Sequence, residues 1–99
     1  MYVEEKHASV ELVDGVIRKN MGCGLYVGEG KAVLRGGTIS DNEGTGAFVT
    51  YVTTGGKVTV AKAEVGKPQT VSKDNTLGDW RTVGKSSEIF GIPQEKIYV

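Results

Sequence analysis

Two stretches of the chain repeat each other at a fixed distance. They are "LVDGVIRKNMGCGLYV" (residues 12–27) and "LRGGTISDNEGTGAFV" (residues 34–49). A gapless comparison of residues 10–27 with 32–49 finds seven identities with the same 22-residue offset: Leu12/Leu34, Gly15/Gly37, Ile17/Ile39, Asn20/Asn42, Gly22/Gly44, Gly24/Gly46 and Val27/Val49. A period of this length is too short for a helical hairpin repeat of about 33 residues, but it matches one coil of a solenoid.

The pattern inside each copy predicts strands. The apolar residues of the first copy fall in three short groups, which are Val10 and Leu12, then Ile17, then Leu25 and Val27. Asp14-Gly15 and residues 20–24 separate these groups and are typical of bends. The 15 glycines, against two prolines, also favour many short strands joined by turns. Each copy is therefore expected to form three strands and two bends, which together make one triangular coil.

The repeated asparagines are predicted to form a ladder. If the copies stack in register, Asn20 and Asn42 occupy equivalent bends, where each amide can hydrogen-bond the backbone of its own bend and the neighbouring asparagine. Such a ladder is needed because an unsatisfied buried polar group costs about 1–3 kcal/mol. The glycines that follow each asparagine are expected to let the chain leave the corner with backbone angles that other residues avoid.

These motifs carry a resemblance to a known fold family. "GVIRKNMGCGLYV" and "GTISDNEGTGAFV" resemble the Ile-x-x-Asn-x-x-x-Gly-x-x-x coil of right-handed parallel β-helix proteins with the pectate-lyase-like architecture. "GGTISDN" is similar to coils of bacterial surface and autotransporter-type proteins and of phage tailspikes. The resemblance covers residues 8 to about 50. It implies an all-β, short, right-handed, single-stranded parallel β-helix of about three to four coils with an irregular C-terminal cap, and it identifies no activity.

Beyond residue 50 the repeat weakens. A further step of the same 22-residue period brings Gly66 level with Gly44 and Val71 level with Val49, which favours a degenerate third coil. A β-hairpin centred on Gly55-Gly56 is the alternative interpretation. Residues 1–71 are thus expected to form the coils, and residues 72–99 an irregular C-terminal cap or the continuation of a longer solenoid.

The last residues predict short elements only. Ser86 or Ser87 is a candidate N-cap of one helical turn, and Pro93 is expected to open another. Residues 97–99 are predicted to form a final strand.

Composition and charge argue against several classes of function. Twelve basic and twelve acidic side chains balance, so no electrostatic footprint for nucleic acid is present. No apolar run approaches the ~20 residues of a membrane-spanning helix, so no membrane insertion is expected. One cysteine, Cys23, and one histidine, His7, are too few for a zinc site, and the glycine-rich stretches lack the strand-to-helix context of a phosphate cradle. No metal or other cofactor is predicted.

The candidate binding residues are Tyr26 and Phe48. With Leu25 and Val27 pointing inward, Tyr26 and Phe48 point outward and lie one above the other at the strand spacing of about 4.8 Å. Stacked exterior aromatics can bind a sugar ring or another protein surface, or can simply stabilise the sheet. Asp41 and Glu43 are the competing candidates, as a carboxylate pair for calcium or glycoside hydrolysis. The preceding copy has Lys19 and Met21 at those places, which favours solvated bend residues and no catalytic role.

The sequence therefore leads to a ranked set of functional hypotheses. The first is a non-enzymatic β-solenoid segment of an extracellular bacterial or phage surface protein, acting as a rigid scaffold or as an adhesive, carbohydrate-binding face. The alternative is an accessory or truncated part of a carbohydrate-active β-helix enzyme, such as a polysaccharide lyase or glycoside hydrolase. A third hypothesis is a trimerising phage fibre domain, which would make the chain a homo-oligomer.

Overall fold

The computed structural model describes residues 1–5, 7–50, 56–63, 65–66, 68–83 and 89–98. These residues contain no α-helix and form eleven short strands and one 3-10 turn. The strands are β1 (Tyr2–Val3), β2 (Ser9–Leu12), β3 (Val16–Arg18), β4 (Leu25–Val27), β5 (Lys31–Leu34), β6 (Thr38–Ser40), β7 (Ala47–Thr50), β8 (Lys57–Val60), β9 (Val71–Lys73), β10 (Trp80–Val83) and β11 (Ile89–Phe90); the 3-10 turn η1 is Gln94–Lys96.

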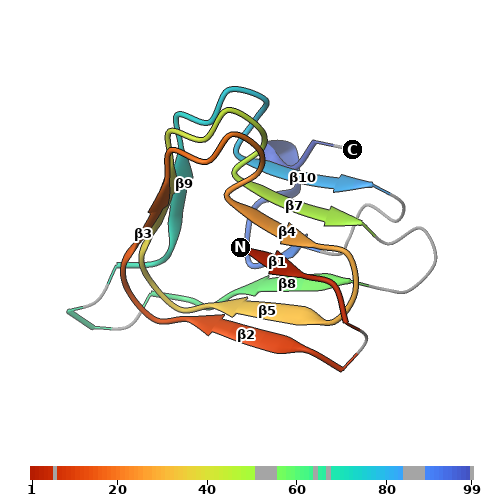
Figure 1. Ribbon diagram of the computed structural model, residues 1–99. Coiled ribbons are helices and arrows are strands. Elements are labelled where there is room, and N and C mark those ends of the chain that lie inside the picture. Colours follow the sequence, from red (N-terminus) through yellow and green to blue (C-terminus); the bar gives the residue numbers. More distant parts are fainter. Residues whose placement is uncertain (6, 51–55, 64, 67, 84–88, 99) are drawn as a thin grey trace.

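The strands assemble into three parallel sheets, which are the three sides of a triangle (Figure 1). Sheet A has the order β1-β4-β7-β10, sheet B the order β11-β8-β5-β2, and sheet C the order β3-β6-β9. From β2 onward the chain visits sheets B, C and A in rotation, so consecutive strands never pair with each other. We call one such passage a coil. Coil 1 contains β2–β4, coil 2 contains β5–β7 and coil 3 contains β8–β10.

The first two coils lie in the register that the repeat predicts. Leu12 pairs with Leu34, Ile17 with Ile39 and Val27 with Val49, and every one of these pairs is parallel. The three apolar groups of the first copy coincide with β2, β3 and β4. An all-β fold of short parallel strands is thus confirmed, and its register follows the 22-residue period over residues 9–50.

The core fills the inside of the triangle. Because side chains alternate along a strand, one residue in two points inward, and in coils 1 and 2 these inward residues are aliphatic on all three sides. The buried apolar residues are Val3, Leu25, Val27, Ala32, Leu34, Ile39, Ala47, Val49, Val58, Val60, Trp80, Ile89 and Ile97. Each Å² of apolar surface removed from water contributes about 25 cal/mol, so the burial of these side chains is the main contribution that holds the coils together.

The third coil is longer than the first two. The spacing between paired residues grows from 22 to 26 in sheet B, where Lys31 pairs with Lys57, and to 33 in sheet C, where Thr38 pairs with Val71. The expectation that Val71 lies level with Val49 is therefore wrong. In the sequence the extra residues fall between β7 and β8 and between β8 and β9, where added chain costs little free energy because closure entropy grows only slowly with loop length.

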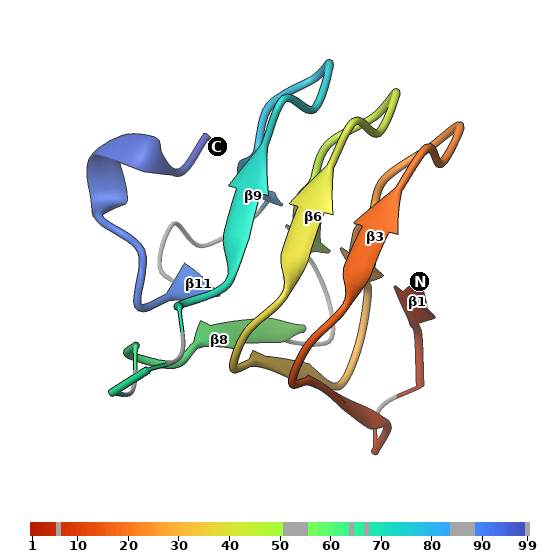
Figure 2. The ribbon, with the colours of Figure 1, turned by 90° about the vertical axis from the view of Figure 1, so that its left-hand side faces the viewer.

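Beyond residue 71 the chain adds strands to the same sheets. β9 extends sheet C, β10 extends sheet A and β11 extends sheet B, and Figure 2 shows β9 continuing the row of β3 and β6. β8 has parallel neighbours on both sides, β5 and β11. The hairpin alternative is wrong for β8, because neither of its edges is left for an antiparallel partner.

The irregular part of the described chain follows β11. Pro93 immediately precedes η1, as predicted for a helical turn opened by proline. Tyr98 forms a single parallel bridge with Arg81, so the final strand is reduced to one residue in the described part of the chain. Gly55, Ser86 and Ser87 lie outside the described residues.

Candidate functional site

The outer face of sheet A carries a row of aromatic side chains. Tyr2, Tyr26 and Phe48 occupy the same position on β1, β4 and β7, and Arg81 takes that position on β10. We call these four residues the aromatic column. The residues on either side of each point inward, as the fully buried Leu25 and the 5% exposed Val3 show. The alternation of the strand therefore forces the column outward.

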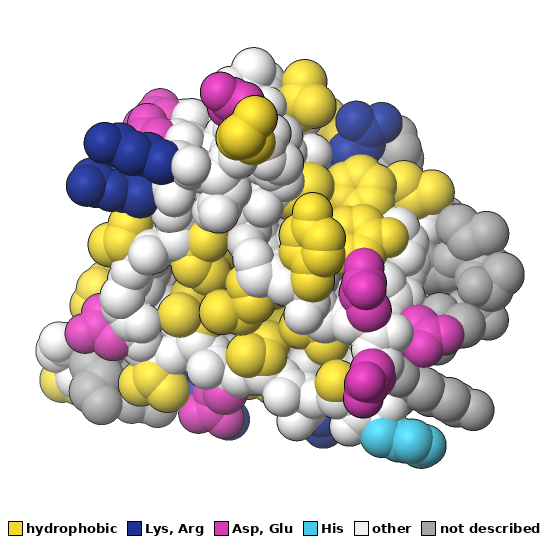
Figure 3. Space-filling view, viewed as in Figure 1, with side chains coloured by type: hydrophobic (Ala, Val, Ile, Leu, Met, Phe, Trp, Pro, Cys, Tyr) yellow, Lys and Arg dark blue, Asp and Glu magenta, His cyan; other side chains and the backbone are white. Residues whose placement is uncertain are grey.

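The rings of the aromatic column contact one another. The Tyr26 and Phe48 rings are stacked, with centroids 5.7 Å apart and an interplanar angle of 10°. Tyr2 and Tyr26 are tilted by 49°, with centroids 5.3 Å apart. Tyr2 is 66% exposed, whereas Tyr26 and Phe48 are half-buried. Figure 3 shows hydrophobic side chains gathered over sheet A, with acidic side chains beside them.

Arg81 ends the row of rings with a cation. Its Cζ atom lies 6.0 Å from the centroid of Phe48, within the range of a cation–π contact. Its Nε atom is buried and has no hydrogen-bond partner among the described residues. Sequence reasoning missed Arg81 and Tyr2 because each lies further from its partner in the column, Phe48 and Tyr26 respectively, than the 22-residue period. The column presents aromatic faces and one positive charge, which suits the apolar face of a sugar ring or a protein surface.

The asparagine bends form a hydrogen-bonded ladder. Asn20 Nδ2 donates to Asn42 Oδ1 at 2.8 Å, and Asn42 Nδ2 donates to Asn75 Oδ1 at 2.7 Å. The backbone N–H groups of Asn20 and Asn42 donate to the same two oxygens, at 3.2 and 3.1 Å. The third member, Asn75, was missed by the fixed period. Its signal is the sequence "KDN", which matches "SDN" at 40–42 once the longer spacing of coil 3 is known.

The ladder ends at an aspartate. Asp79 Oδ1 accepts from the Asn75 backbone N–H at 3.2 Å and from Asn75 Nδ2 at 3.0 Å. This is the same pair of bonds that an asparagine of a following coil would accept. Asn75 Nδ2 also donates to the Ile39 carbonyl and to Ser72 Oγ, each at 3.2 Å. Asp79 therefore substitutes for the next rung.

Three of the four repeated glycines that follow the asparagines matter for their small size, not for their backbone angles. The left-handed backbone conformation lies one residue before each asparagine, at Lys19, Asp41 and Asp74, with φ between 55° and 57°. The repeated glycines after Asn20 and Asn42 have no positive φ, so the expectation that they provide unusual angles is wrong. A Cβ atom on Gly24 would lie 2.7 Å from the Nδ2 atom of Asn42. The ladder thus packs directly against the backbone of this glycine.

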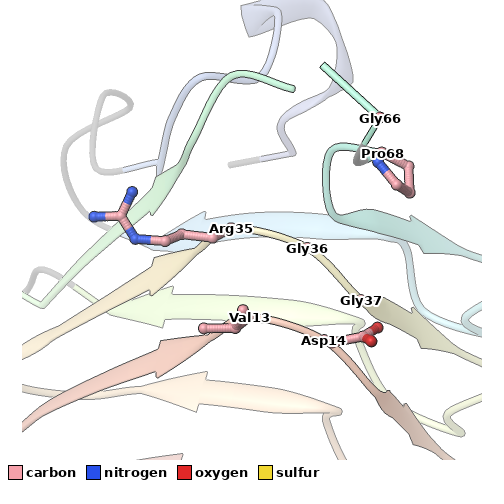
Figure 4. A pocket seen from close by; sticks show the side chains of 7 residues that line it. All are labelled: Val13, Asp14, Arg35, Gly36, Gly37, Gly66 and Pro68. Carbon is pink, nitrogen blue, oxygen red and sulfur yellow. The ribbon is translucent and has the colours of Figure 1, made fainter. Parts of the chain in front are cut away.

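A groove of about 320 Å³ lies at the corner between sheets B and C (Figure 4). Its lining includes Asp14, Arg35 and Pro68. The Asp14 carboxylate bonds its neighbouring backbone N–H at 2.7 Å, and Arg35 Nε pairs with Glu11 Oε1 at 3.2 Å. Figure 4 shows the Arg35 side chain pointing away from Asp14. The charged groups do not converge on the groove, so it is a poor candidate for a polar ligand.

The other candidate residues lie apart from the aromatic column. Asp41 and Glu43 are exposed on the bend of coil 2, on either side of the buried Asn42. Cys23 is a half-buried free thiol, and His7 is exposed. No group of three or more His, Cys, Asp or Glu side chains in the described ranges is arranged to hold a metal ion.

Within the described part of the chain, no helix has the length and apolar character that crossing a membrane would require. Comparison with protein-family models, with curated proteins and with solved structures found no match for this chain.

Proposed function

We propose that this chain is a right-handed, single-stranded parallel β-helix and that it serves as a non-enzymatic segment of an extracellular bacterial or phage surface protein. The rotation of strands through three parallel sheets supports the architecture, as does the strict register of coils 1 and 2. In this role the chain is a rigid spacer that also presents an adhesive face.

The scaffold role is supported by the way in which the coils share their stability. Ordering the backbone costs about 1–2 kcal/mol for each residue, which the few apolar residues of one coil cannot offset alone. Pairing between coils on three sides and the buried ladder through Asn42 and Asn75 supply the remainder. Each coil thus depends on its neighbours for its stability, as expected for a stacked scaffold.

The adhesive role depends on one observation, the outward row of rings at Tyr2, Tyr26 and Phe48. Tyr2 and Tyr26 offer hydroxyl groups beside apolar ring faces, the combination that suits a carbohydrate, which is polar at its edges and apolar on its faces. The ligand we propose is a glycan on a cell surface, held against sheet A.

The test is binding of the intact chain to a glycan array. Tyr26→Ala removes the central ring, and we expect its affinity for the glycans that bind the parent chain to fall at least tenfold. Tyr26→Phe keeps the ring and should bind like the parent or a few-fold more weakly. Leu77→Ala is the matched control, because it truncates an apolar side chain that is 62% exposed on another part of the surface.

The outcomes separate the functional hypotheses. Equal binding by Tyr26→Ala and the parent would overturn the adhesive face. Release of soluble product from a polysaccharide would favour the enzyme alternative instead. A trimer in sedimentation at micromolar concentration would favour the fibre-like homo-oligomer.

A further inference from the structure

The end of the stack at β2 and β3 is open. β2 pairs only with β5, and β3 only with β6, so each has one free edge among the described residues. The inward side chains of these strands are only partly buried, whereas their counterparts one coil later are at most 1% exposed. The partly buried residues are Val10, Leu12 and Ile17, and the counterparts are Ala32, Leu34 and Ile39.

Among the described residues, only sheet A continues beyond coil 1 at this end. β1 adds one strand to sheet A above coil 1, but no described strand lies beyond β2 in sheet B or beyond β3 in sheet C. A groove of about 460 Å³ runs beside β1, and its lining includes Val3, Ala8 and Val10. Figure 3 shows hydrophobic side chains in the middle of this face, inside the triangle that the strands of Figure 1 outline.

The asparagine ladder indicates which hydrogen-bonding groups a binding partner at this end would need. Asn42 Oδ1 and Asn75 Oδ1 each accept two hydrogen bonds, one from a backbone N–H and one from a side-chain amide of the preceding rung. Asn20 Oδ1 accepts none from the described residues, although Asn20 donates to Asn42 in the same way as Asn42 donates to Asn75. The first rung therefore presents an acceptor that calls for a backbone N–H and an amide donor.

We propose that the open end binds another polypeptide that contributes one further parallel coil. Its two strands pair with the free edges of β2 and β3, its aliphatic side chains cover Val10, Leu12 and Ile17, and an asparagine at its bend donates to Asn20 Oδ1. This inference rests on the proposed β-helix, because it extends the same stack by one coil. Main-chain hydrogen bonds supply the affinity, and the amide of the added asparagine sets the register of the added strands.

A second copy of the chain does not have the required chemistry. Two copies placed with their open ends together would oppose one Asn20 Oδ1 acceptor to another. At the far end, the donors of Asn75 are already taken by Asp79 Oδ1, Ser72 Oγ and the Ile39 carbonyl. Residues 91–98 follow β11 there, with Ile97 buried against the core.

The experiment is an NMR titration of the intact 15N-labelled chain with a synthetic peptide of residues 31–44, KAVLRGGTISDNEG. This peptide carries the two strands and the asparagine bend of coil 2. We expect saturable shifts at β2, β3 and Asn20 at millimolar peptide, since a free peptide must be ordered as it binds. The same peptide with Asn42→Ala lacks the amide donor and should bind at least tenfold more weakly.

A matched protein variant isolates the amide contact. In Asn20→Ala the acceptor is absent, so the two peptides should bind with affinities within about twofold of each other, as expected when one member of an interacting pair is removed. No saturable shifts at β2 and β3 at millimolar peptide, or equal binding of both peptides by the parent chain, would overturn the inference. So would shifts at β2 and β3 that depend on protein concentration without peptide, because the occupant would then be a second copy.

Failure of this inference and failure of the proposed function are distinguishable. If the chain binds glycans through Tyr26 but does not bind the peptide, only the inference about the open end is overturned. If the chain binds the peptide at β2 and β3 but binds no glycan, only the adhesive role is overturned.

Discussion

The two ends of the stack are built from the same repeating coil but end in different ways. At the end of coil 3, Asp79 accepts the hydrogen bonds of the last asparagine, and Ile97 of the terminal segment is buried. At the end of coil 1, Leu12 and Ile17 are partly exposed and Asn20 Oδ1 has no donor among the described residues. The ladder thus has a direction: its donor end is closed by Asp79, and its acceptor end at Asn20 is open.

This difference teaches that a repeat does not determine its own ends. A coil in the middle is stabilised on both sides, whereas a coil at an end keeps one unpaired edge unless other residues replace the missing neighbour. Among the described residues, β11 and the Tyr98 bridge cover the edges of β8 and β10 at the coil 3 end, whereas at the other end β1 covers only the edge of β4. Substitutions at equivalent positions in different coils should therefore have unequal effects.

The largest effect is expected for the leucine of sheet B. Leu34→Ala should lower the free energy of unfolding by about 3–4 kcal/mol, because Leu34 is 1% exposed and its removal leaves a cavity. Leu12→Ala, at the equivalent position of the open coil, should cost about 1–2 kcal/mol, since solvent already reaches this residue. Urea denaturation of both variants checks this. Equal losses would show that coil 1 is covered as well as coil 2.

A smaller difference is expected within the ladder. Asn42→Ala should cost about 2–3 kcal/mol, because the two donors of Asn20 lose their acceptor and the oxygen of Asn75 keeps only the bond from the backbone N–H of residue 42. Asn20→Ala removes one end of the ladder and should cost about 1 kcal/mol. Thermal unfolding followed by circular dichroism measures both. A change within experimental error for Asn42→Ala would contradict the ladder as a source of stability.

The smallest effect concerns the closed end. Asp79→Ala should cost about 1–2 kcal/mol, because the backbone N–H and the amide of Asn75 lose an acceptor. Asp79→Asn keeps the side-chain oxygen and should cost less than about 0.5 kcal/mol, which makes it the matched control. Hydrogen exchange at the Asn75 amide reports the same contact locally. If both variants lost equal stability, the charge of Asp79 rather than its oxygen would end the ladder.

The parts of the fold that could be predicted are those in which equivalent residues recur at constant spacing. The strands of coils 1 and 2, their register and the outward direction of Tyr26 and Phe48 all follow from the 22-residue period and the alternation of apolar residues. The period also brings Asn20 and Asn42 to adjacent bends. These features are local or repeat locally, so the sequence expresses them directly.

The third coil could not be predicted from the same spacing. Extra residues in the sequence before β8 and before β9 lengthen the spacing between paired residues, first in sheet B and then further in sheets C and A, so Val71, Asn75 and Arg81 fall out of phase with the first two coils. The residues that continue the aromatic column and the ladder were consequently missed. Loop length carries little energetic cost, and so the pairing of the strands, rather than the distance along the chain, determines the register.

The sequence by itself determined the repeating unit: three short strands, an asparagine bend and an aliphatic interior, because each depends on residue type and on spacing within one coil. Only the tertiary structure decided where the repeat continues, which residues join Tyr26 on the outer face, and how each end is finished. Those outcomes depend on contacts between residues far apart in the sequence, such as Tyr2 with Tyr26 and Phe48 with Arg81. The stack aligns such residues through hydrogen bonds between coils, and no local pattern encodes that alignment.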